Sequence, residues 1–100
     1  MHTRIVAEAE FELGEAIARY EEIEAGLGIR LKDEARAVIS WIETHPAVPR
    51  IRPAGYRRVN LKIFRYFVAY TVRGETIWVL AIAHGHRRPE FWKERKSQML

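Results

Sequence analysis

The sequence of 100 residues contains no cysteine, which excludes disulfide bonds and thiolate chemistry. No apolar run approaches the roughly 18 residues that a membrane-spanning helix needs. The first residues also lack the charged-then-apolar pattern of a secretory signal. We therefore expect a cytoplasmic protein that is neither exported nor inserted into a membrane.

Several signatures of binding chemistry are also missing. The sequence has no glycine-rich phosphate loop, no zinc-ligand spacing and no nucleophile elbow. His84 and His86 are too few for a metal site, which takes three or four ligands. We therefore expect no metal and no other cofactor.

The charged residues are divided unevenly along the chain. About half of the residues are apolar (48%), enough for one core, and the length fits a single domain over residues 1–100. Residues 1–48 contain 5 Lys/Arg and 10 Asp/Glu, a net charge of −5. Residues 49–100 contain 12 Lys/Arg and 3 Asp/Glu, a net charge of +9. A one-sided basic surface is typical of a protein that binds a polyanion or an acidic partner. The alternative is a solvated basic face that an acidic face balances.

The first half of the chain predicts a short strand and two helices. Residues 3–7 favour a strand, and apolar residues at spacings of three and four predict helices over residues 8–24 and 29–43. Residues 25–28 separate the helices, and His45-Pro46 ends the second one. So short a link predicts an antiparallel helical hairpin. The expected buried stripes are Leu13, Ala16, Ile17, Tyr20 and Ile23, then Leu31, Ala35, Val38, Ile39 and Ile42.

The second half predicts strands. In residues 57–63, Val59, Leu61 and Ile63 alternate with Arg58, Asn60 and Lys62, which indicates a strand with one basic face. Residues 66–72 and 76–83 are nearly apolar throughout, so both strands should be central, joined by a tight turn at residues 73–75. Simple alternation places Trp78, Leu80, Ile82 and His84 on one face.

These elements predict an α+β fold. The order is β-α-α-β-β-β, with Pro89 starting a short C-terminal helix. The helical hairpin should pack on one face of a mainly antiparallel sheet, and the other face should be basic and open to solvent or a partner.

The segment from His84 to Trp92 is the richest in candidate functional groups. His84 and His86 are possible proton acceptors, or hydrogen-bonded histidines at a strand end. Phe91 and Trp92 either stack on a base or dock on the core. Arginine and lysine side chains suit phosphate or carboxylate, although each one alone is as often simply solvated. The candidate cations are Arg57, Arg58, Lys62, Arg65, Arg87 and Arg88.

Three stretches together resemble the RelE/ParE superfamily of bacterial toxins from type II toxin–antitoxin systems. They are residues 55–59 (GYRRV), residues 64–70 (FRYFVAY) and residues 79–92 (VLAIAHGHRRPEFW), and the last is the most specific. The resemblance covers nearly the whole chain. It implies a growth-inhibiting toxin that a cognate antitoxin neutralises. It also implies that operator DNA is contacted only through the antitoxin.

The resemblance implies two different mechanisms. RelE-like members cleave messenger RNA on the ribosome without a metal, for which His84 or His86 would be the base. Arg58, Lys62, Arg87 and Arg88 would stabilise the phosphorane, and Trp92 would stack. ParE-like members inhibit DNA gyrase by binding.

The sequence leaves the mechanism open. RelE-like toxins carry an arginine directly after the tyrosine of the third-strand motif, whereas here Phe67 follows Tyr66. Whether the protein is an enzyme is therefore not decided at this point. His84, His86 and Arg87 are the candidate catalytic residues, with Arg57, Arg58, Lys62, Arg65, Arg88 and Trp92 as candidate target contacts. A non-toxic basic module that binds nucleic acid or protein is the alternative from another class.

Overall fold

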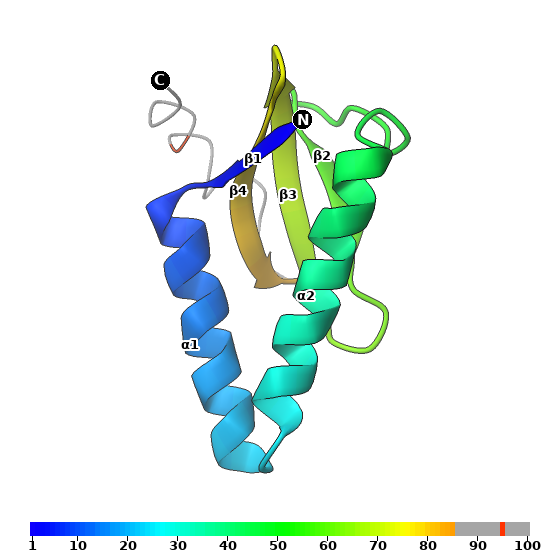
Figure 1. The fold of residues 1–100 in the computed structure, drawn as a ribbon. Helices are drawn as coiled ribbons and strands as arrows, with labels where there is room; N and C mark the ends of the chain where they lie inside the picture. The colour runs from blue at the N-terminus through cyan, green and yellow to red at the C-terminus, as the bar shows by residue number, and fades with distance from the viewer. Residues whose placement is uncertain (86–94, 96–100) are drawn as a thin grey trace.

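The computed structural model describes residues 1–85 and residue 95. Two helices lie over a sheet (Figure 1), in the order that the sequence predicts. The elements are β1 (His2–Ile5), α1 (Ala7–Ile23), α2 (Leu27–Thr44), β2 (Arg57–Asn60), β3 (Tyr66–Arg73) and β4 (Thr76–His84).

The strands of the described residues form one mixed sheet in the order β1-β4-β3-β2. β1 is parallel to β4, and the other two pairings are antiparallel. The apolar strands β3 and β4 are central, and the two described helices cover the same face of the sheet (Figure 1). The predicted α+β fold with a helical hairpin on one sheet face is confirmed.

Two predicted strands are shorter than expected. The first ends at Ile5, and α1 already begins at Ala7. β2 ends at Asn60, so the predicted strand over residues 57–63 is wrong in its second half, and Ile63 is 67% exposed. The reason is that Asn60 already pairs with Phe67, so residues 61–65 must turn the chain into β3, and the N–H groups of residues 62–64 bond to the Glu34 carboxylate of α2.

A β-bulge in β4 changes which side chains share a face. Ala69 lies opposite Ala81, but Tyr70 lies opposite Val79, so β4 has one extra residue, Leu80. Trp78 therefore faces away from the helices, while Ile82 and His84 face towards them. The expectation that Trp78, Ile82 and His84 share one face is wrong, because alternation is interrupted at the bulge.

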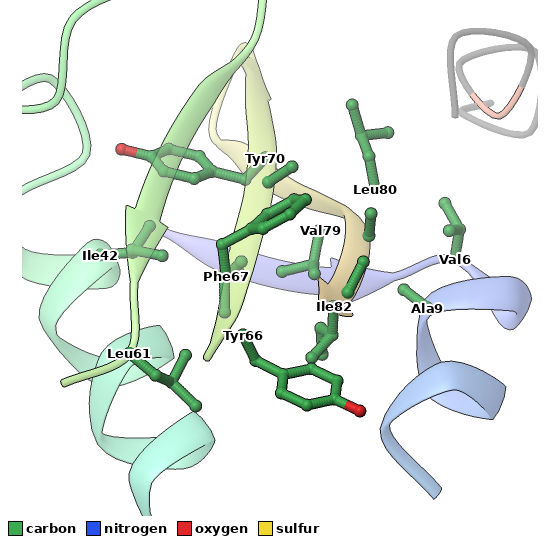
Figure 2. Close-up of a cluster of buried hydrophobic side chains, with 14 of the residues drawn as sticks. Val6, Ala9, Ile42, Leu61, Tyr66, Phe67, Tyr70, Val79, Leu80 and Ile82 are labelled. Carbon is green, nitrogen blue, oxygen red and sulfur yellow. The ribbon is translucent and has the colours of Figure 1, made fainter. Parts of the chain in front are cut away.

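The core fills both sides of the central strands. Leu31 is among its largest fully buried side chains. So are Tyr70, Phe67 and Ile42 (Figure 2). The predicted helix stripes are largely buried or packed on this core, except Ile23, which is 69% exposed in the last turn of α1.

The sheet face turned away from the helices is not uniformly basic. At its centre Phe67, Ala69 and Ala81 are completely buried. Two cations lie on its outer strands. Arg4 of β1 lies over the Trp78 ring, and Arg58 of β2 lies over the Phe67 ring. The prediction of an open basic face is therefore wrong at the centre, because β3 and β4 are apolar on both faces.

No helix among the described residues is long and apolar enough to cross a membrane. In the same part of the chain, His, Asp and Glu side chains form no group of three or more that could hold a metal ion.

Candidate functional site

His84 ends β4 on the helix-facing side of the sheet. Its ring meets the ring of Tyr66 edge-on, with centroids 5.6 Å apart. The Tyr66 hydroxyl accepts a hydrogen bond from Arg19 of α1 at 3.3 Å. Burial raises the pKa of Tyr66, and the Arg19 charge acts against that rise. His84 is thus tied to α1 through one tyrosine.

A cleft of about 810 Å³ lies beside His84, between α1 and the end of β4. Its wall on α1 carries the carboxylates of Glu8, Glu12 and Glu15. Arg19 and Arg95 supply its positive charge. The candidate base His84 therefore lies in a cleft of mixed charge, lined by three carboxylates and two guanidinium groups.

Glu12 and Arg95 form an ion pair at the edge of β4. Both terminal guanidinium nitrogens of Arg95, Nη1 and Nη2, donate to the Glu12 carboxylate at 3.0 Å. The Arg95 side chain is 13% exposed and the Glu12 side chain 18%. Arg95 also donates to the carbonyl of Leu80, and Glu12 accepts the N–H of Ile82. The pair thus bonds to the backbone of β4 beyond the end of its neighbour β1.

Arg57 is held by a loop of its own chain. Its guanidinium donates to the carbonyls of Ala47 and Pro49. Tyr70, opposite Arg57 on β3, donates its hydroxyl to the carbonyl of Pro46 at 2.7 Å. Arg57 therefore helps to fix the loop before β2.

Three of the predicted cations come together. Arg58, Lys62 and Arg65 line a depression of about 370 Å³, together with Gly85. The Arg58 guanidinium lies 4.0 Å from the centre of the Phe67 ring and donates to Asn60 at 3.0 Å. Burial, and secondarily the nearby charge of Arg52, lower the pKa of Arg58.

His84 and these cations line different hollows, the cleft beside α1 and the depression beside Gly85, and Tyr66 borders both. His86, Arg87, Arg88 and Trp92 lie outside the described residues, as does the predicted helix at Pro89. Sequence patterns also did not single out Glu12 and Glu34, since both resemble ordinary solvated helix glutamates.

Comparisons with known proteins agree with this fold. Residues 7–89 match the family model described as the ParE toxin of a type II toxin–antitoxin system, parDE. A solved structure described as the chromosomal ParDE toxin–antitoxin system from P. aeruginosa has a similar fold, with a TM-score of 0.61 at 15% identity. That match covers 84% of this chain and 95% of the other. No curated protein matches the sequence.

The family model spans both helices and all strands from β2 to β4. The resemblance that the sequence motifs indicated is therefore confirmed. This chain belongs to the ParE toxin family of type II toxin–antitoxin systems.

Proposed function

We propose that this protein inhibits bacterial growth, that a cognate antitoxin neutralises it, and that it acts by binding DNA gyrase. Membership of the ParE toxin family supports the toxin role. The observation that favours binding over RNA cleavage is that His84 lies on the helix-facing side of the sheet beside Tyr66, whereas Arg58 lies over Phe67 on the opposite side.

Metal-free cleavage of RNA needs a base and cations around the same phosphate. The cleft beside His84 carries three carboxylates and two guanidinium groups, and one of these, Arg95, is already paired with Glu12. The negative charges of Glu8 and Glu15 oppose a phosphodiester there. The predicted target cations Arg58, Lys62 and Arg65 line a different depression, which suits recognition of a partner without chemistry.

Ribosome-dependent cleavage of messenger RNA is the second candidate. One observation favours it: the depression lined by Arg58, Lys62 and Arg65 includes Gly85, the residue before His86. In this mechanism His86 and Arg87, which lie outside the described residues, would supply the chemistry.

Induced expression in bacteria tests the toxin role. We expect growth arrest, and normal growth when the cognate antitoxin is co-expressed. Normal growth at verified soluble expression would contradict toxicity and favour a non-toxic binding module.

The same cultures separate the two targets. Gyrase inhibition predicts cleaved DNA trapped on gyrase with intact messenger RNA. Codon-positioned cuts that disappear in His86→Ala would instead establish the ribonuclease mechanism.

A further inference from the structure

The loop between β2 and β3, residues 61–65, is held by one carboxylate. Glu34 of α2 accepts the N–H groups of Lys62 at 3.1 Å, Ile63 at 3.1 and 3.2 Å, and Phe64 at 3.3 Å. Backbone amides that converge in this way are an arrangement with which proteins hold anions. Here the anion comes from the chain itself.

Further contacts fix the loop at both ends. The N–H of Leu61 donates to the carbonyl of Tyr66 at 2.9 Å, and the N–H of Gly85 donates to the carbonyl of Arg65 at 2.7 Å. Leu61 and Phe64 are each 6% exposed, and the Phe64 ring meets Tyr20 of α1 edge-on at 5.1 Å. The loop is therefore ordered before any partner binds.

The remaining side chains of the loop point outward. Lys62 and Arg65 are exposed, and Ile63 between them is 67% exposed. These side chains are not needed for the packing of the loop, which Leu61, Phe64 and Glu34 provide. An ordered loop that exposes an isoleucine between two cations offers apolar and basic contacts with little further loss of conformational entropy on binding.

We propose that the 61–65 loop is the contact surface of this toxin for an acidic protein target, and that Glu34 is the positioning residue that holds it. The proposal rests on the proposed function and deepens it, since it assigns target binding to Lys62, Ile63 and Arg65. Arg58, on the same depression, extends the positive charge.

The loop suits a protein better than a nucleic acid. Its convergent amides are already occupied by Glu34, whose negative charge disfavours a phosphate there. Ile63 requires an apolar notch in the partner, while Lys62 and Arg65 require carboxylates around that notch. We therefore assign an acidic protein surface as the occupant.

Inhibition of purified DNA gyrase tests the loop directly. We expect Ile63→Ser and Lys62→Glu each to raise the half-inhibitory toxin concentration about tenfold or more, as is usual for central interface residues. Their thermal midpoints should stay near that of the wild type, because both side chains are exposed. Ile51→Ser is the matched control, since Ile51 is 62% exposed in the loop before β2. It should leave inhibition unchanged.

Variants of Glu34 test the positioning role. In Glu34→Ala, the amides of residues 62–64 should exchange hydrogen about tenfold faster, and gyrase inhibition should weaken. Glu34→Gln retains an acceptor oxygen and should restore part of the slow hydrogen exchange and part of the gyrase inhibition. Asp33→Ala on the same helix removes an equal charge and should alter neither.

The possible outcomes distinguish a wrong assignment of the loop from a wrong proposed function. If the wild type inhibits gyrase and Ile63→Ser and Lys62→Glu inhibit equally well, the loop assignment is wrong and the function stands. If the loop variants lose RNA binding instead, the occupant is a nucleic acid and the proposal is overturned. A wild type that neither stops growth nor inhibits gyrase defeats the proposed function, and the loop assignment with it.

Discussion

Tyr66 and Tyr70 are buried on the helix-facing side of β3, although each carries a hydroxyl group. Arg19 donates to the Tyr66 hydroxyl, and the Tyr70 hydroxyl donates to the carbonyl of Pro46. Burial raises the pKa of both phenols above the ordinary value of 10.0. Both side chains thus favour their neutral form in the folded state.

This burial predicts a loss of stability at alkaline pH. Above pH 10 or so, the unfolded chain releases the phenolic protons while the folded chain keeps them, so the free energy of unfolding should fall. The fall is at most about 1.4 kcal/mol per pH unit for each tyrosine. Urea unfolding between pH 8 and 11 measures it.

Tyr70→Phe provides the comparison for this prediction. At pH 8 the free energy of unfolding of the variant should be about 1 kcal/mol lower than that of the wild type, because the hydrogen bond to the Pro46 carbonyl is gone. Above pH 10 its stability should fall less steeply than that of the wild type. Equal slopes in the two proteins would contradict the role of Tyr70.

Glu12 and Glu34 show why single residues of the site were missed. Glu34 bonds to amides that lie 28 to 30 positions further along the chain, and Glu12 bonds to an amide 70 positions away. On its own helix, each resembles an exposed glutamate outside the apolar stripe. Only the packing of helix against sheet brings the carboxylate to unpaired backbone groups, and local sequence patterns do not contain that information.

At the scale of elements, the two helices meet closely at Gly28. A Cβ atom built at this position would lie 2.4 Å from the carbonyl oxygen of Ile17 in α1. The sequence indicated only a break at residues 25–28, whereas the structure includes Gly28 in α2. The Glu21 carboxylate accepts the N–H groups of Gly26 and Gly28, which closes the turn.

This close approach predicts opposite effects for two glycine substitutions. Gly28→Ala should lower the free energy of unfolding by about 1–3 kcal/mol, because α1 and α2 must move apart. Gly14→Ala should raise it by about 0.5–1 kcal/mol, since Gly14 lies inside α1 with open space around it. Denaturant unfolding of both variants and the wild type measures these two changes. A Gly28→Ala protein as stable as the wild type would mean that the helices are not packed this closely.

Periodicity predicted the element order well and failed where hydrogen bonding left the regular pattern. Alternation continues through Leu61, Lys62 and Ile63, yet these residues lie in the turn into β3, where Glu34 accepts the N–H groups of Lys62 and Ile63. The bulge at Leu80 likewise has no polarity signal, since β4 is apolar on both sides of it. Apolar patterns specify burial, but the register of a sheet also depends on which backbone groups find partners.

For the whole molecule, the charge asymmetry of the sequence becomes an asymmetry between α1 and the segment that follows α2. Helix α1 contains six glutamates and one arginine, a net charge of −5, whereas residues 49–85 contain seven Lys/Arg and one glutamate, a net charge of +6. α1 lies over the sheet (Figure 1), and Arg58, Lys62 and Arg65 gather at a separate depression, so negative and positive charge occupy different parts of the surface. Such a field orients an acidic partner before contact.

This field predicts how salt affects capture by the proposed acidic antitoxin. The association rate with the purified antitoxin should fall about tenfold or more between 50 and 300 mM NaCl, because salt screens the attraction, while the dissociation rate should change less. Lys62→Glu should slow association at low salt, and Glu22→Gln on α1 should leave it equal or slightly faster. Stopped-flow mixing gives both rates. An association rate independent of salt would show that the charge asymmetry does not steer binding, and capture would then depend on short-range contacts with apolar surface such as Ile63.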